Sequence, residues 1–318
     1  MDNLVRLTTL KVVEKAKNVK INREKIKELA RQWMKEKMVV PAWPKEFHLQ
    51  AKSQQAMLDY LIILDALNFC FWNKDKIWIF NYNGKKYYGY FGLSLALKKF
   101  FEENPEKGSL NYFANISFDD FLKILDGGEN LQFLRKRWQI ARQVSKKIIK
   151  KYGDSEKFVL SANHKLSELV PKISREIFSF NDIADYNGKK VYILKRAQIL
   201  PADIWGAFDG KGIGYFEDLD YLTAFADYKL PQILQLWGIL EYSPKLLKKI
   251  KNKVIIAKGS KEEVEIRSST IWAVEYLKEE LGKLGKRLFS LQIDWILWNK
   301  SQEQRMLTPY HLTKTFYY

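Results

Sequence analysis

Cysteine is nearly absent from this chain of 318 residues, and long runs of uncharged apolar residues do not occur in it. The single cysteine, Cys70, cannot form an internal disulfide, and it lies in the apolar segment 67–72, so we expect a small core residue in a reducing compartment. Asp59 and Asp65 interrupt the best apolar candidate, which leaves nothing close to the roughly 18 uncharged residues of a membrane helix. Residues 1–6 lack the basic-then-apolar order of a signal peptide. We therefore expect a cytoplasmic protein with no membrane partner.

Histidine is also scarce, with His48, His164 and His311 as its three copies. Three scattered histidines and one cysteine give no metal-ligand spacing, so we expect neither a zinc site nor another cofactor. Signatures of Ser-His-Asp hydrolases and of deaminases are absent as well. His48 follows the loop 43–47, outside any periodic apolar face, and its position alone favours a solvated or backbone-bonded loop histidine.

Apolar and basic residues are abundant instead. Hydrophobic residues make up 47% and aromatic residues 14% of the chain, enough to bury a real core. No Ser-, Gly- or Pro-rich linker divides the sequence, so we predict a single domain over residues 1–318 that acts as a monomer. The formal net charge of +17 is compatible with nucleic-acid binding, but lysines such as those of 245–253 alternate with apolar residues as on solvated helix faces. The same field would attract a small anionic substrate, and we expect no stable nucleic-acid complex.

Helical periodicity dominates the pattern and predicts a mainly α fold. The first forty residues read as helices, with Asn22 as a cap, and Pro41 and Pro44 begin an irregular stretch. Further helices are expected over these ranges: 53–71, 92–152 with breaks at 104–105 and 127–128, 155–180, 195–208, 217–225, 229–241, 262–283 and 285–300.

One small β-hairpin is expected in this helical fold. Residues 77–82 and 87–90 are rich in β-formers and flank Asn83-Gly84, a strong type I′ turn signal. The pentapeptide Tyr-Asn-Gly-Lys-Lys recurs at 186–190, which we interpret as repeated turn chemistry and not as duplication.

The second half of the chain contains the clearest functional signal. Gly210, Gly212 and Gly214 permit backbone N–H groups to converge on an anion, and Asp227 follows thirteen residues later. The segment is neither a Rossmann fingerprint nor a P-loop, because no strand precedes it and Lys211 is not followed by Ser or Thr. Helix-hairpin-helix DNA glycosylases use a similar plan, with an aspartate at the sugar, which is an analogy of architecture only. Asp227 could equally be a helix N-cap.

Two further helical segments contain buried-looking charges. Asp294 is the one acid of the apolar segment 291–299, where it could pair with a cation or accept the N–H groups of a purine-like base. Trp295 and Trp298 beside it are more typical of core residues. In 263–275, charged residues alternate with apolar ones, and internal ion pairing is the favoured interpretation.

Together these segments resemble the queuosine salvage family. The motifs Arg-Ala-Gln-Ile-Leu at 196–200 and Phe-Ala-Asp-Tyr at 225–228 are the most specific. The similar stretches follow in family order and span nearly the whole chain: 68–72, 89–96, 195–205, 222–234, 263–275, 294–299 and the aromatic 315–318.

The resemblance implies a helical, DNA-glycosylase-like (helix-hairpin-helix) domain that hydrolyses queuosine 5′-monophosphate to queuine and ribose 5-phosphate. It implies that Asp227 is the catalytic carboxylate and that the base pocket is lined by His48, Phe225, Asp294, Trp295 and Asn299. Lys195, Arg196 or Lys229 would hold the 5′-phosphate. The chain departs from the family pattern at Asn299, where we expect an acid; an amide loses charge attraction for the secondary ammonium of the base's side arm.

Two alternatives remain open at this point. The charge and the glycine segment also fit a nucleic-acid-binding module or a DNA/RNA glycosylase of the helix-hairpin-helix type. A non-catalytic queuine carrier is the other alternative. Steep salt dependence of tRNA or duplex binding would favour the first of these.

Overall fold

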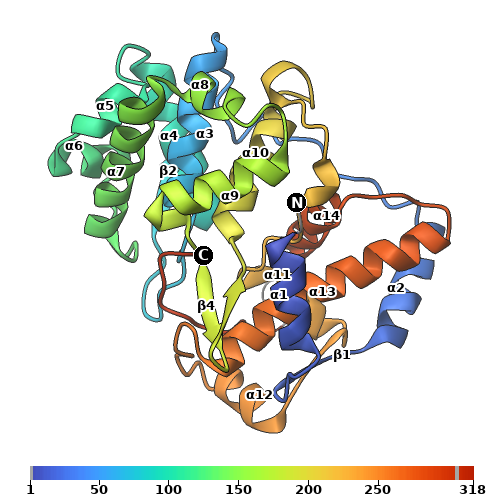
Figure 1. Ribbon diagram of the computed structural model, residues 1–318. Coiled ribbons are helices and arrows are strands. Elements are labelled where there is room, and N and C mark those ends of the chain that lie inside the picture. The colour runs from blue at the N-terminus through green and yellow to red at the C-terminus, as the bar shows by residue number, and fades with distance from the viewer. Residues whose placement is uncertain (1–2, 305–307) are drawn as a thin grey trace.

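The computed structural model describes residues 3–304 and 308–318, and helices make up most of this part of the chain (Figure 1). The α-helices are α1 (Leu4–Val13), α2 (Arg23–Lys35), α3 (Gln54–Leu67), α4 (Gly89–Glu103), α5 (Leu110–Asn115), α6 (Phe118–Ile124), α7 (Leu134–Tyr152), α8 (Ser155–Leu160), α9 (Leu166–Glu176), α10 (Lys195–Ala207), α11 (Lys229–Leu236), α12 (Pro244–Lys251), α13 (Lys261–Lys283) and α14 (Ser290–Glu303). Three 3-10 helices, η1 (Phe178–Phe180), η2 (Gly212–Gly214) and η3 (Leu219–Tyr221), connect them. The mainly α prediction is confirmed. None of the helices described is long and apolar enough to cross a membrane.

Side-chain caps explain where several helices begin. The Asn22 side chain accepts a hydrogen bond from the Lys25 N–H at the start of α2, as predicted. Ser53 and Ser260 cap α3 and α13 in the same way. The irregular stretch after Pro41 is also confirmed, since no helix or strand is assigned between α2 and α3.

The strands form three antiparallel pairs, two of which are hairpins. β2 (Ile79–Tyr82) pairs with β3 (Lys85–Tyr88), and β4 (Ile183–Tyr186) pairs with β5 (Lys189–Tyr192). β1 (Val19–Ile21) pairs with the distant β6 (Leu240–Tyr242). Both hairpins turn at an Asn-Gly dipeptide with φ angles of 48° and 73° in the first and 53° and 76° in the second. The predicted β2–β3 hairpin and the predicted repeat of its turn are confirmed, whereas the second hairpin and the β1–β6 pair were not predicted.

Two expected helices are shorter than predicted or missing. Residues 217–225 contain only η3, after which residues 222–226 run without helix or strand, and α11 ends at Leu236, before β6. No helix therefore starts directly after the glycine segment. Gly214 serves close packing instead: a Cβ on it would lie 2.6 Å from Cβ of Phe208 and 2.9 Å from the carbonyl oxygen of Ile204.

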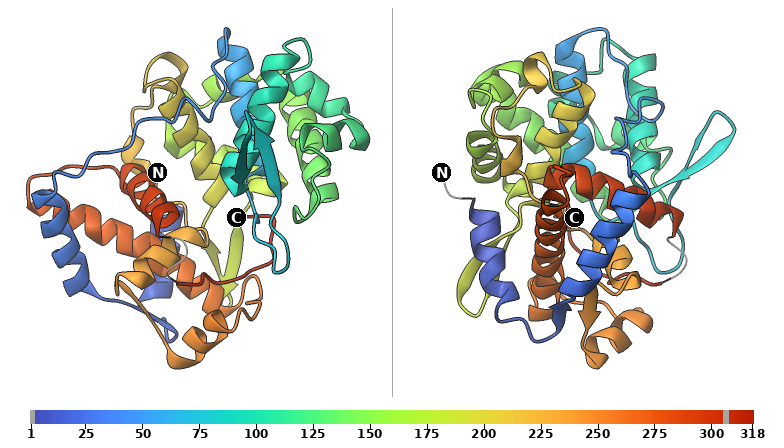
Figure 2. Two further views of the ribbon diagram at one scale, coloured as in Figure 1. Left: turned by 180° about the vertical axis from the view of Figure 1, so that it is seen from behind. Right: turned by 90° about the vertical axis from the view of Figure 1, so that its right-hand side faces the viewer.

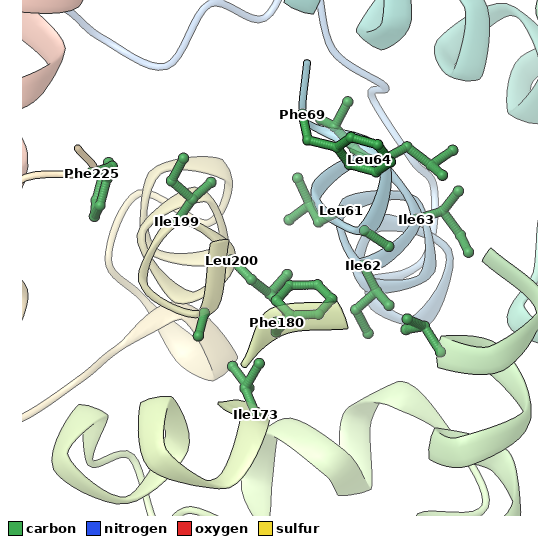
Figure 3. Packing of buried hydrophobic residues seen from close by; sticks show 14 of the residues in the cluster. Leu61, Ile62, Ile63, Leu64, Phe69, Ile173, Phe180, Ile199, Leu200 and Phe225 are labelled. Atoms are coloured by element: carbon green, nitrogen blue, oxygen red, sulfur yellow. The ribbon is translucent and has the colours of Figure 1, made fainter. Parts of the chain in front are cut away.

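The buried apolar side chains form two clusters. The larger cluster extends through α3 to α10 and contains Cys70, which is fully buried, as predicted. The smaller one joins α2 and α11 to α14. Figures 1 and 2 show α5 to α7 toward one end of the molecule and α2 and α12 toward the other, with α10, α11 and α14 between them. Within the larger cluster, Leu200 of α10 and Phe180 lie between α10 and α3 (Figure 3).

Candidate active site

A cavity of about 950 Å³ lies where the two apolar clusters meet. Its volume falls within the range of pockets that bind small molecules. Helix α10 contributes Lys195, Ile199 and Asp203, which are spaced four residues apart and so share one face of the helix. The opposite walls come from the irregular loop 41–48, the β3–α4 junction, residues 225–230 and α14.

The extended segment 222–226 is held by side chains of three helices. Gln198 of α10 accepts hydrogen bonds from the backbone N–H of Thr223 (2.9 Å) and from its hydroxyl (3.1 Å). The Phe225 N–H donates to Oδ2 of Asp294, on α14, at 2.7 Å. These polar contacts satisfy backbone groups that a helix would otherwise pair internally, which explains why residues 222–226 are not helical despite their apolar sequence.

The third support of this segment is Arg267, on α13. Its Nε donates to the carbonyl oxygen of Ala226 at 2.9 Å, one residue before Asp227. Its two Nη atoms form ion pairs with Asp182 (2.6 Å) and with Glu263 (3.2 Å), and all three side chains are almost completely buried. The predicted ion pairing within 263–275 is confirmed by the Arg267–Glu263 pair.

Asp227 lies in the cavity wall and also caps the following helix. Its Oδ1 accepts hydrogen bonds from the backbone N–H groups of Lys229 (2.6 Å) and Leu230 (3.1 Å), at the start of α11. The residue is 9% exposed. The predicted cap is therefore present in a residue that also lines the cavity, and the cap fixes the direction of the carboxylate.

The three predicted phosphate ligands lie in different environments. Lys195 and Lys229 line the cavity, Lys195 buried and Lys229 half-buried. Burial lowers the pKa of Lys195, which the charge of Asp227 partly opposes. Arg196 is absent from the cavity wall: its guanidinium is fully buried and donates to the backbone carbonyl oxygens of Asp65, Ala66, Ser179 and Phe316.

Besides Asp227, three buried carboxyl groups lie in or near the cavity wall. Desolvation raises the pKa of Asp294 to about 8, and the nearby charge of Asp227 adds to the effect. Desolvation also raises the pKa of Asp65 to about 7 and that of Asp203 well above its ordinary value. Asp203 and Asp294 line the cavity, whereas Asp65, on α3, lies behind it.

His48 is fully buried, in contrast to the solvated loop histidine that its position favoured. Its ring stacks on Trp43 with centroids 4.1 Å apart. Nδ1 lies 3.1 Å from the Tyr60 hydroxyl and Nε2 lies 3.4 Å from the Tyr90 hydroxyl. Burial lowers the pKa of His48 to about 3, so the ring is neutral.

Most of the predicted site residues meet at this cavity. Those that line it are His48, Lys195, Phe225, Asp227, Lys229, Asp294, Trp295 and Asn299. The glycine segment 210–214 does not line it, so the predicted backbone anion site is not part of the cavity. Asp203 and Tyr90 also line the cavity but were not predicted from the sequence. The helical spacing of Asp203 from Lys195 was the available signal. Among the described residues, no group of three or more His, Cys, Asp or Glu side chains could hold a metal ion.

Comparison with known proteins gives concordant matches. The family model described as "Queuosine salvage protein" matches residues 47–318. A protein of Sphaerobacter thermophilus is 38% identical over 316 residues, which cover 99% of this chain and 97% of that protein. A Dictyostelium discoideum protein is 34% identical, covering 99% and 98%, and one of Mus musculus is 34% identical, covering 84% and 83%. All three are named queuosine 5′-phosphate N-glycosylase/hydrolase.

Proposed function

This chain belongs to the queuosine salvage protein family, and on that premise we propose that it hydrolyses the N-glycosidic bond of queuosine 5′-phosphate, releasing queuine and ribose 5-phosphate. The observation that supports this most directly is Asp227: its carboxylate is oriented by two backbone N–H groups in the wall of a cavity of about 950 Å³. The aromatic and apolar walls suit a flat heterocycle, and the acid suits the sugar carbon next to it.

The carboxylate of Asp227 acts on the ribose. When the bond between the anomeric carbon and the base nitrogen breaks, its electron pair leaves with the base and positive charge develops on the ribose ring. A fixed carboxylate stabilises that charge more than water does, because it needs no reorganisation during the reaction. A water molecule completes the reaction by bonding to the anomeric carbon and losing one proton.

Other cavity residues contact the base and the phosphate of the substrate. Phe225 and Trp295 offer flat surfaces to the base, and Asp294 and Asn299 offer polar atoms to its edge and its side arm. His48 lines the same pocket, with its ring stacked on Trp43. Lys229 contacts the 5′-phosphate, because it lies two residues after Asp227 and is more exposed than Lys195, and a charged phosphate remains close to solvent. Lys195 lies deeper, where its charge interacts with that of Asp227.

Release of queuine from queuosine 5′-phosphate, followed by mass spectrometry, tests this function. Asp227→Ala is expected to lower kcat by about 10²–10⁴ or more, since it removes the charge next to the ribose. Asp119→Ala is the matched control, because Asp119 is an exposed residue of α6, which does not contribute to the cavity. Activity of Asp227→Ala within tenfold of the wild type would contradict the assigned role.

We further infer that the protein acts as a cytoplasmic monomer that forms no stable nucleic-acid complex, and that its fold is related to helix-hairpin-helix DNA glycosylases. The residues that line the cavity all come from one chain, which supports the monomer. The buried thiol of Cys70 suits a reducing compartment. Light scattering measures the mass in solution, and salt-dependent binding of tRNA tests the nucleic-acid alternative.

A further inference from the structure

Asp203 is a cavity acid for which the proposed chemistry has no role so far. It lies eight residues after Lys195 on the same face of α10, about 12 Å further along the helix axis, with Ile199 between them. A nucleotide whose ribose lies at Asp227 and Lys195 would therefore extend its base over Ile199 toward Asp203. The residue is 5% exposed, so any charge on it is poorly solvated.

A chain of polar contacts connects Asp203 to His48 and ends at a backbone carbonyl. The Tyr90 hydroxyl lies 3.4 Å from Oδ2 of Asp203 and 3.4 Å from Nε2 of His48. The Tyr60 hydroxyl lies 3.1 Å from Nδ1 of His48 and donates to the carbonyl oxygen of Ser94 at 3.2 Å. That carbonyl can only accept, so it determines the direction of every other hydrogen bond in the chain.

Assigning the protons from that end places one on Asp203. Tyr60 uses its only proton on Ser94, so Nδ1 of His48 must donate to Tyr60. His48 is neutral, so its Nε2 must accept the proton of Tyr90. The contact between Tyr90 and Asp203 is then a hydrogen bond only if the carboxyl group of Asp203 is protonated and donates.

The charges around Asp203 favour the same protonation state. Desolvation is the largest cause of its raised pKa, and the carboxyl groups of Asp65 and Asp294 raise it further. Lys195 and the Tyr90 hydroxyl oppose these effects without cancelling them. Neither carboxyl oxygen of Asp65 has a hydrogen-bond partner among the described residues, which adds to the cost of a second negative charge there.

On the premise of the proposed function, we propose that Asp203 is the general acid that protonates the leaving base. As the bond to the anomeric carbon breaks, its electron pair moves onto the base, and the Asp203 proton is transferred to a ring nitrogen or carbonyl oxygen conjugated with the glycosidic nitrogen. A 7-deazapurine lacks N7, so an acid at another edge is required. Water bonds to the anomeric carbon, and its released proton goes to the Asp227 carboxylate.

Tyr90 is the positioning residue for this step. Its hydroxyl lies 3.4 Å from Oδ2 of Asp203 and equally close to Nε2 of His48, so with Asp203 protonated it accepts the proton of that acid. Once Asp203 has given up its proton, the single proton of Tyr90 can turn from His48 to the new carboxylate. The contact is thus a hydrogen bond both before and after the transfer, which reduces the cost of the buried negative charge.

Two substrates with different leaving groups test the assignment. Asp203→Asn is expected to lower kcat for queuosine 5′-phosphate by about 10²–10⁴, because an amide is isosteric but transfers no proton. With 4-nitrophenyl riboside 5-phosphate, whose phenolate departs without protonation, the loss should shrink to less than about tenfold. Asp227→Ala should lose activity on both substrates. Equal losses of Asp203→Asn on both substrates, or a loss below threefold on the natural one, would overturn the proposal.

The pH profile gives a second readout. Activity requires protonated Asp203, so kcat of the wild type should fall as the pH rises through the raised pKa of Asp203 in the substrate complex. Since Asp294 also titrates in the alkaline range, Asp294→Asn serves to assign the decline. If Asp203 is responsible, the decline of kcat at alkaline pH persists in Asp294→Asn and is lost in Asp203→Asn. A decline that persists in Asp203→Asn overturns the proposal. Tyr90→Phe should lower kcat about tenfold and shift the decline to higher pH.

Thermal unfolding of each variant shows that it is folded before it is assayed, and Tyr90→Phe tests the step if Asp203→Asn is not stable. Wild-type turnover of queuosine 5′-phosphate is measured first. No turnover would refute the proposed function itself, whereas turnover combined with equal losses on the two substrates refutes only the role of Asp203.

Discussion

Arg267 shows how one buried side chain connects the fold to the site. Its guanidinium pairs with Asp182 and Glu263 and also donates to the backbone next to Asp227. The Asp182 backbone carbonyl in turn accepts from the N–H groups of Ile193 and Leu194, just before α10. The start of α10 and the segment before Asp227 are therefore held by a single ionic cluster.

Replacement of Arg267 is expected to destabilise the whole protein. Arg267→Met removes the only cation of this cluster among the described residues and leaves two buried carboxylates without it, which should lower the free energy of unfolding by about 3–5 kcal/mol. Urea denaturation measures the change. Lys27→Met is the control, since it breaks an exposed ion pair with Glu24, and it should change the midpoint little. A similar small change in Arg267→Met would show that the cluster contributes no net stability.

Neighbouring residues illustrate the limit of prediction at this scale. Lys195 and Arg196 were equivalent candidates in sequence, but successive helical residues point about 100° apart. One side chain therefore faces the cavity and the other faces the backbone of α3 and of residue 316. Asp203 was missed for a related reason, because its role depends on His48 and Tyr90, which come from distant segments.

At the scale of elements, local signals were reliable where the local sequence determines the backbone. The Asn-Gly dipeptides predicted both turns, of which only the first was expected to form a hairpin, and Asn22 predicted the start of α2. Residues 217–225 were predicted helical from their apolar pattern, but Gln198, Asp294 and Arg267 hold the backbone of 222–226 extended. These contacts come from residues far away in the sequence, so the local pattern of the segment cannot predict them.

The two hairpins provide a matched experiment, because they share the same five-residue turn. Gly84 and Gly188 both have positive φ and open space around them, so valine at either position meets only backbone strain of about 1–2 kcal/mol. Lys86, Tyr87 and Tyr88 of the first hairpin line the cavity, whereas the second hairpin contributes nothing to it. Gly84→Val should therefore raise KM, and Gly188→Val should lower thermal stability with KM unchanged.

Steady-state kinetics and thermal unfolding of Gly84→Val and Gly188→Val show whether KM changes only in the first variant. An equal rise of KM in the two variants would mean that the first hairpin has no special relation to the substrate. Figure 2 shows the β2–β3 hairpin at the surface of the molecule.

At the scale of the whole molecule, the buried acids around the cavity lower the stability of the folded protein when no ligand is bound. Its acids are buried at the meeting of two apolar clusters, and burial raises the pKa of Asp65 to about 7 and of Asp294 to about 8. In the unfolded chain these groups lose their protons near pH 4. Between pH 4 and 8 the folded state therefore binds more protons than the unfolded state, and stability falls as the pH rises.

We expect the ligand-free protein to be more stable at pH 6.5 than at pH 8.5, by an amount on the order of 2 kcal/mol. The buried histidines do not oppose the effect in this window. Burial lowers the pKa of His48 and His311 to about 3, so they destabilise the folded state only below about pH 6.5, where the same histidines become protonated in the unfolded chain. Urea denaturation at the two pH values measures the difference. Asp294→Asn should reduce it, and a protein more stable at pH 8.5 would contradict the assigned protonation states.

Tryptophan is concentrated around the cavity, and this offers an optical consequence. Trp43, Trp72, Trp295 and Trp298 line it, four of the ten in the chain. A flat heterocycle that enters would come against several indole rings and exclude water from them. Intrinsic tryptophan fluorescence should consequently decrease in intensity or shift in wavelength when a ligand binds in the cavity. Binding can therefore be followed without a label and before the glycosidic bond is cleaved.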